Sequence, residues 1–287
     1  MVNMGKKLAA LLLAALMLLG LTGCGAFETK MARAVQKISK ADSLRLEVLD
    51  ELSVDVTAAG KTVTVPLTLS GTVQLYLGPL KARAELTLEG PAGQTELLYY
   101  IEESGDAFNI YQNINGGTAW QKMGLTAGRE IRANGLKYIV EGAETFERVE
   151  EAGADEGFFR YDGEVPGEFI QGFLELYEVR ERLEEEYGLT LDETLFQDLS
   201  SIPTTLWLNN RGELDLILLE PGALVDGLLG KLLTDPLAAS GLNGLDLSLR
   251  VTDNRIVIQM GDYNQLESME IPQEARRAAG DEMEPWE

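Results

Sequence analysis

The feature that most constrains the fold is a hydrophobic alternation of period two that runs through the first half of the chain. Such alternation is typical of strands with one face on a core and the other in water, as in an antiparallel meander. It therefore predicts long, consecutive antiparallel strands. The apolar positions form four sets: Leu44, Leu46, Val48, Leu52, Val54 and Val56, interrupted only at Asp50; Val63, Val65, Leu67, Leu69, Val73, Leu75 and Leu77; Leu80, Ala82, Ala84, Leu86 and Leu88; and Leu97, Tyr99 and Ile101.

Turn-forming residues separate these sets and mark the ends of the expected strands, at positions 58–60, 78–79 and 90–93. A further strand is expected around 107–111. In the second half, strands are expected over 204–209 and 213–219, joined by a hairpin turn at 209–212. The last apolar alternation, from Leu245 to Val251, is predicted to turn back through Thr252-Asp253-Asn254 and to pair with Ile256, Ile258 and Met260.

Helical periodicity appears at the start and in the middle of the chain. Met31, Val35 and Ile38 have the i, i+4, i+7 spacing of one helix face, within a helix expected over 28–40. Further helices are predicted over 129–140, over 166–187 with Phe169 and Phe173 on one face, over 191–199, and after Pro221. No linker or short repeat divides the chain. The expected fold class is α+β, a long curved antiparallel sheet packed against helices.

The N-terminus has the composition of a secretion signal. Lys6 and Lys7 precede the uncharged run Leu8 to Leu21, which would span only ~21 Å as a helix and is short for a bilayer of ~30 Å. Leu21-Thr22-Gly23-Cys24 closes the run and resembles the lipobox of bacterial lipoproteins. Residues 1–23 are therefore predicted to be a signal peptide, and Cys24 the lipidated first residue of the exported chain. The alternative is an ordinary signal peptide, or a buried helix, that contains a cysteine.

A diacylglyceryl group on Cys24 would supply two acyl chains, which is what stable membrane anchoring requires. The expected location is the extracytoplasmic face of the cell membrane. The net charge is −23, and the two leader lysines are the only charged groups before Cys24, so the chain from Cys24 onward carries −25. Nucleic acid and anionic lipid surfaces repel such a body and are not expected partners.

The chain contains no histidine and only one cysteine. This composition excludes Ser-His-Asp and Cys-His mechanisms and every histidine-ligated metal site. Acidic clusters lie at 150–151, 155–156 and 184–186. They could hold a divalent cation, but none has the spacing of a calcium loop, and a solvated surface is the simpler interpretation. We expect no enzyme activity, no cofactor and no metal.

Two short segments complete a resemblance to a known group: Trp120-Gln121-Lys122, and the closing Ile271-Pro272 with Glu274-Ala275. They accompany the acylated start, the single amphipathic helix, the consecutive strands and the central helices. This order of elements along the chain resembles the LolA/LppX-like lipoprotein superfamily, which includes many lipoproteins of Gram-positive bacteria. The resemblance implies an open half-barrel over 24–275 whose apolar hollow receives acyl chains in several members. Residues 276–287 are expected to form a mobile acidic tail.

Two functional hypotheses follow. In the first, the apolar strand faces line a hollow for a lipid or other apolar ligand, with Leu75, Leu86 and Tyr99 in its wall and Phe169 and Phe173 as its cap. The alternative for these residues is a filled core. The second hypothesis is an interaction or sensor module that presents its sheet or its acidic surface to another envelope protein.

Overall fold

A single antiparallel sheet of eleven strands organises the computed structural model, in the order β6-β5-β4-β3-β2-β1-β11-β10-β9-β8-β7. The structure describes residues 29–38, 40–105, 107–126, 145–149, 158–167, 170–171, 194–234 and 247–277. The strands are β1 (Ser43–Ala58), β2 (Lys61–Leu77), β3 (Leu80–Gly90), β4 (Gly93–Ser104), β5 (Ala107–Ile114), β6 (Gln121–Thr126), β7 (Glu147–Val149), β8 (Phe158–Val165), β9 (Ile202–Asn209), β10 (Leu214–Leu219) and β11 (Leu247–Gly261).

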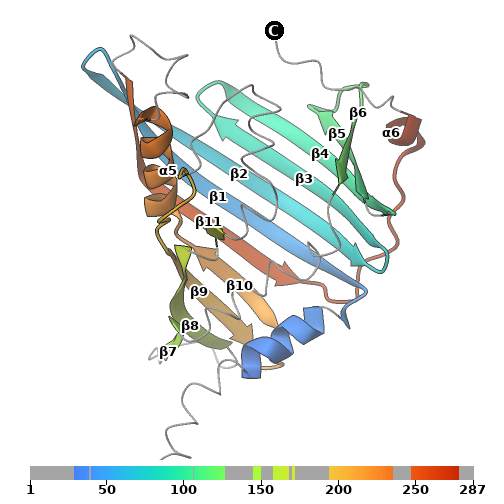
Figure 1. Ribbon diagram of the computed structural model, residues 1–287. Coiled ribbons are helices and arrows are strands. Elements are labelled where there is room, and N and C mark those ends of the chain that lie inside the picture. Colours follow the sequence, from blue (N-terminus) through green and yellow to red (C-terminus); the bar gives the residue numbers. More distant parts are fainter. Residues whose placement is uncertain are drawn as a thin grey trace, which may run out of the picture.

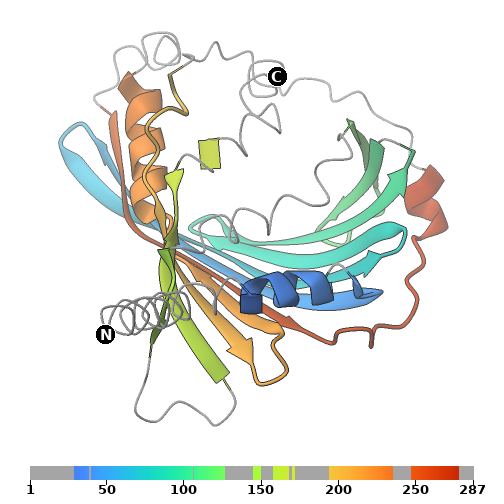
Figure 2. The ribbon, with the colours of Figure 1, turned by 60° about the horizontal axis from the view of Figure 1, so that its bottom comes forward.

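The sheet is curved and does not close on itself, because β6 and β7 lie at opposite ends of the strand order (Figures 1 and 2). The predicted meander is confirmed, since β1 to β5 pair in succession and the reversals after β1, β2 and β3 fall at the expected turns. The α+β open half-barrel is likewise the observed architecture. Only β11 departs from sequence order, since it returns to pair with β1 and joins the two halves of the sheet.

The predicted hairpin at Thr252-Asp253-Asn254 is wrong, because Leu247–Gly261 forms one continuous strand. The polar residues are accommodated as a bulge of β11: Ser53 pairs with Asp253 while Val54 pairs with Val251, so Thr252 is the extra residue between them. The Thr252 hydroxyl also donates to the Ser53 carbonyl at 3.2 Å. The short helix expected over 191–199 is also not observed in its described part, where residues 194–198 form turns and bends.

Gly71 allows the close approach of strands at the middle of the sheet. A Cβ at this position would lie 2.0 Å from the Glu85 carbonyl oxygen of β3 and 2.8 Å from the Leu86 Cα. No side chain fits between two backbones at that distance, so only glycine permits it. Glycines at such positions let a sheet bend sharply.

One end of the concave face is covered by the helix over residues 29–38 (Figure 2). Its predicted apolar face is confirmed: Met31 and Ala34 are fully buried, and Val35 and Ile38 pack beside them. They contact a cluster whose most deeply buried members are Leu206, Leu208 and Leu214 of β9 and β10. This is the larger of the two core clusters among the described residues.

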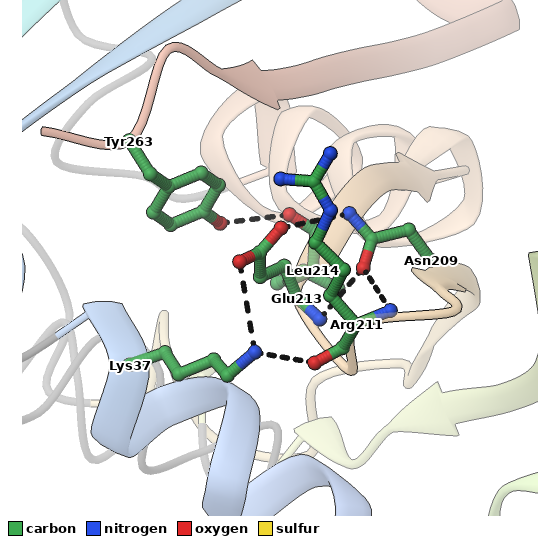
Figure 3. Close-up of polar contacts among 6 residues, drawn as sticks. All are labelled: Lys37, Asn209, Arg211, Glu213, Leu214 and Tyr263. Atoms are coloured by element: carbon green, nitrogen blue, oxygen red, sulfur yellow. Dashed lines mark hydrogen bonds and ion pairs between the residues drawn. The ribbon is translucent and has the colours of Figure 1, made fainter. Parts of the chain in front are cut away.

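Polar contacts hold this helix against the β9–β10 turn (Figure 3). Lys37 Nζ lies 3.6 Å from Glu213 Oε1 and also donates to the Arg211 carbonyl. Asn209 Oδ1 accepts from the backbone N–H groups of Arg211 and Glu213, both at 3.0 Å. The Tyr263 hydroxyl donates to the Leu214 carbonyl at 2.8 Å. Burial, followed by the charges of Glu213 and Asp215, raises the pKa of Tyr263, so the phenol stays neutral and keeps its proton for this bond.

Two further helices lie beyond the strands. Helix α5 (Gly222–Thr234) follows Pro221 as predicted and packs against β11, where Asp226 Oδ1 accepts from the Val251 N–H at 2.7 Å. Helix α6 (Gln273–Arg277) lies on the opposite, convex face. There Ile271 and Ala275 pack on Tyr100 and Tyr111. The C-terminal part of the chain therefore covers the outer face of the sheet.

Candidate functional site

The concave face carries the three described residues that the sequence places in the wall of a ligand site. Leu75 of β2 pairs with Ala82 of β3, and Tyr99 of β4 pairs with Ala84 of β3. Leu86 lies two residues beyond Ala84, so it points to the same face. Leu75, Leu86 and Tyr99 therefore occupy three successive cross-strand rows of one surface.

These rows continue across five strands. The row of Tyr99 runs through Leu46, Val73, Ala84 and Gln112. Beside it, the row of Leu86 runs through Val48, Gly71, Leu97 and Ile114. The result is a wide surface, apolar except for a few positions, that crosses β1 to β5.

Much of this surface is only half-buried. Leu75, Leu86 and Tyr99 all have intermediate exposure, and neither described core cluster includes them. Toward the far rim, Val63, Leu88 and Ile114 are 63%, 38% and 42% exposed. Large apolar patches left open on a protein surface usually mark interaction sites. This half of the concave face has the properties of a wall for an apolar ligand.

Small residues lie at the centre of this wall. Ala82 and Ala84 of β3 are buried, while their cross-strand neighbours Leu75 and Tyr99 are larger and half-buried. Gly71 adds a third position without a bulky side chain, next to Leu86. Small side chains of β3 therefore lie between larger apolar side chains of β2 and β4.

Tyr99 brings one polar group to this surface. Its hydroxyl oxygen accepts a hydrogen bond from Gln112 Nε2 at 2.9 Å. Burial raises the pKa of Tyr99, so the phenol is neutral at physiological pH. Its hydroxyl retains a proton that it can donate to an ester or hydroxyl oxygen of a ligand.

Asp50 is a second polar group on the same face. It interrupts the alternation of β1 and sits between Leu69 of β2 and Ile256 of β11. Its Oδ1 accepts from Nδ2 of the buried Asn254 at 3.0 Å, and the same amide lies 3.3 Å from the Glu51 carbonyl. Burial raises the pKa of Asp50, and the bond from Asn254 partly opposes that rise. The break in the alternation marks this residue in the sequence, but the turn predicted at Thr252-Asp253-Asn254 does not indicate its pairing with Asn254.

Three predicted site residues, Cys24, Phe169 and Phe173, lie outside the described residues. So do the acidic clusters at 150–151, 155–156 and 184–186. Within the described ranges, no group of three or more acidic residues is arranged to hold a metal ion. In that same part of the chain, no helix combines the length and apolar character needed to cross a membrane.

The chain matches no known family model, and no curated protein is similar to it in sequence. Among solved structures, it is similar to LprF from Mycobacterium bovis, with 10% identity, 86% of this chain and 97% of that chain covered, and a TM-score of 0.44. It is also similar to a DUF1329 family protein from Desulfovibrio piger, with 9% identity, 86% and 95% coverage, and a TM-score of 0.23. The strand order and curvature of this chain agree with the half-barrel that the sequence resemblance implies.

Proposed function

We propose that this protein is a membrane-anchored lipoprotein of the cell exterior that holds a lipid, or another molecule with acyl chains, on the concave face of its sheet. The protein acts as a binding protein rather than as an enzyme. Cys24 carries the acyl anchor. Leu75, Leu86 and Tyr99 contact the ligand, and Phe169 and Phe173 cover it.

The half-buried apolar surface over β2 to β5 is the observation that carries this proposal. Transfer of apolar surface out of water is favourable by about 25 cal/mol per Å². A chain that leaves leucine, valine and isoleucine side chains open on a concave surface can recover this free energy by binding an acyl chain. A flat or convex surface would surround such a chain less completely.

The short connection to the anchor supports a resident holder over a freely moving carrier. The described helix begins at residue 29, five residues after Cys24. Five extended residues reach at most about 18 Å. The body therefore stays near the bilayer surface, where an acyl ligand could be received or returned.

Native mass spectrometry of the full lipoprotein, purified from membranes, tests the ligand. We expect added masses that correspond to acyl-containing molecules and that solvent extraction removes. Leu86→Lys should lower the loaded fraction about tenfold, because it places a charge in the apolar wall. Thr87→Lys is the matched control, since Thr87 points to the convex face. Equal loading of both variants, or no added mass in the wild type, would contradict the proposal.

Metabolic labelling with radioactive palmitate tests the anchor separately. The wild-type chain should incorporate the label, and Cys24→Ser should abolish incorporation and release the protein from the membrane fraction. An unlabelled wild-type chain would remove the anchor from the proposal. It would leave the concave surface as a site for an apolar ligand in an unanchored protein.

A second candidate function rests on the convex face. Leu49, Val257 and Leu218 are cross-strand neighbours on β1, β11 and β10, and Leu216 pairs with Trp207 of β9. All five are only half-buried, and neither described cluster includes them. This apolar patch supports an interaction or sensor module that docks another envelope protein. Crosslinking in intact cells from position 218 would yield a stable protein partner if the patch serves this purpose.

A further inference from the structure

A groove lies on the convex face, remote from the concave surface, between the strands and the chain segment that follows β11. Its floor is formed by Arg45 of β1, Gln74 and Tyr76 of β2, Arg83 of β3 and Tyr100 of β4. Its other wall consists of Asp262 and residues 265–270. We call residues 262–270 the C-terminal wall. The groove has a volume of about 590 Å³, within the range of ordinary ligand pockets.

Contacts along its length hold the C-terminal wall in place. At its start, the Asn264 N–H donates to the Ser43 carbonyl at 2.8 Å, and Asn264 Oδ1 accepts from the Asp42 N–H at 2.6 Å. In the middle, the Tyr76 hydroxyl donates to the Glu267 carbonyl at 2.6 Å. Beyond its end, Ile271 is buried against the sheet. The groove is therefore preformed, and a ligand would not have to order its walls.

The charges in this groove disfavour an anionic ligand. Arg45 Nε lies 3.2 Å from Asp262 Oδ2, and Arg83 Nη2 lies 2.6 Å from Glu85 Oε1, so each guanidinium already has a carboxylate. Glu267 and Glu270 add two more carboxylates to the wall. A phosphate or a polyanion would meet more negative than positive charge. Apolar ligands are also disfavoured, since Leu266 and Met269 are the only aliphatic side chains in the lining.

The remaining chemistry matches a molecule that both donates and accepts hydrogen bonds without net charge. Amide, hydroxyl and guanidinium groups supply donors, and the carboxylates and the Gln74 and Gln265 amides supply acceptors. Tyr76 contributes an aromatic ring, whose electron-rich face attracts polarised C–H groups.

We propose that this groove binds a neutral oligosaccharide. Each sugar hydroxyl is both a donor and an acceptor, and each pyranose has a C–H face that packs on an aromatic ring. A peptide would need apolar side pockets for its side chains, and the two aliphatic residues of the wall do not form them. The site does not depend on the concave surface or on its ligand.

Titration calorimetry of the full-length protein with chitotriose, maltotriose and triglycine tests the site. We expect at least one of the two glycans to bind and triglycine not to bind. Gln74→Ala should weaken glycan binding about tenfold, the loss expected for one to two hydrogen bonds. Thr72→Ala is the matched control: Thr72 lies two residues away on the same strand and face, outside the groove.

Three results would overturn the proposal: no binding of either glycan, binding of triglycine instead, or equal glycan affinity of the Gln74→Ala and Thr72→Ala variants. Unchanged circular dichroism of both variants separates loss of binding from loss of fold. Leu86→Lys should leave glycan affinity unchanged while it lowers the fraction loaded with acyl ligand. The two sites can therefore fail independently.

Discussion

The two halves of the concave face carry the same kind of sequence and have different packing. Over β9 and β10, Leu206, Leu208 and Leu214 are almost completely removed from solvent beneath the helix over residues 29–38. Over β2 to β4, Leu75, Leu86 and Tyr99 are half-buried and belong to neither described cluster. We call these regions the covered half and the open half.

This difference shows that alternation reports which face of a strand is apolar, but not what lies against it. The covered half gains its burial from Met31 and Ala34, which are more than 170 residues away from Leu206 in sequence. The polar contacts of Lys37 with Glu213 and Arg211 then fix the helix at the β9–β10 turn. The open half keeps its apolar surface available. Stability should therefore depend on the first half and ligand binding on the second.

Leu206→Ala should have the largest effect on stability. Leu206 is 0% exposed, and a leucine-to-alanine change at a fully buried site costs about 2–5 kcal/mol through lost burial and a residual cavity. Urea unfolding followed by circular dichroism measures the change in the free energy of unfolding. If Leu206→Ala cost no more than the same substitution at Leu86, the distinction between the two halves would fail.

Gly71→Ala should be the next most harmful substitution. The new Cβ would stand 2.0 Å from the Glu85 carbonyl oxygen, so β2 and β3 would have to separate, at a cost of about 1–3 kcal/mol. Gly261→Ala is the control, since a Cβ there has no neighbour within 4 Å. Thermal unfolding of both variants checks this expectation. A harmless Gly71→Ala would show that the close approach is not required for the curvature.

Leu86→Ala should cost only about 1 kcal/mol of stability, because the side chain is half-buried and its removal leaves no sealed cavity. The substitution should clearly lower the fraction of protein that carries ligand, while the free energy of unfolding changes little. Comparison of the unfolding curve with the loaded fraction in native mass spectra sharpens the contrast with Leu206. A cost equal to that of Leu206→Ala would instead indicate a filled core in the open half.

Asp50→Asn should have the smallest effect, and its sign depends on pH. Burial raises the pKa of Asp50 in the folded state above its ordinary value of 3.8, so the folded state binds the proton more tightly than the unfolded state. Asp50 therefore stabilises the folded wild-type protein at pH values below its ordinary pKa. This contribution is lost as the pH rises through the raised pKa of the folded state. We expect the variant to be slightly more stable than the wild type at neutral pH.

Urea unfolding at a series of pH values checks this expectation. The asparagine Oδ1 can still accept the bond from Asn254, so the difference between the proteins reports mainly on the charge. The two proteins should converge in stability below the ordinary carboxyl pKa. A variant that is less stable than the wild type at neutral pH would mean that the carboxylate has a favourable partner on the concave face.

Local patterns predicted much of the architecture. The strands β1 to β4, their turns and the apolar face of the first helix follow from periodicity and turn chemistry, which act over a few residues. The same reasoning failed at Thr252-Asp253-Asn254, where three turn-forming residues lie inside β11. There the long ladder with β1 outweighed the local preference, because each extended residue gains a backbone partner.

The residues of the candidate sites also divide into those that local patterns predict and those that they do not. Leu75, Leu86 and Tyr99 could be assigned to one face from their sequence positions, because alternation and hairpin register are local. The pairing of Asp50 with Asn254 could not, since 204 residues separate them. The convex groove was also missed, because the crossing of residues 262–270 over β1 to β4 leaves no periodic signal.

The order of residues by itself therefore determined a one-sided, antiparallel meander with an apolar face on each long strand. Only the tertiary structure decided which part of that face is sealed by a helix, which part stays open, and where the chain crosses the outer surface. The physical reason is range: backbone pairing and side-chain alternation are set by near neighbours, whereas burial depends on elements brought together from distant parts of the chain.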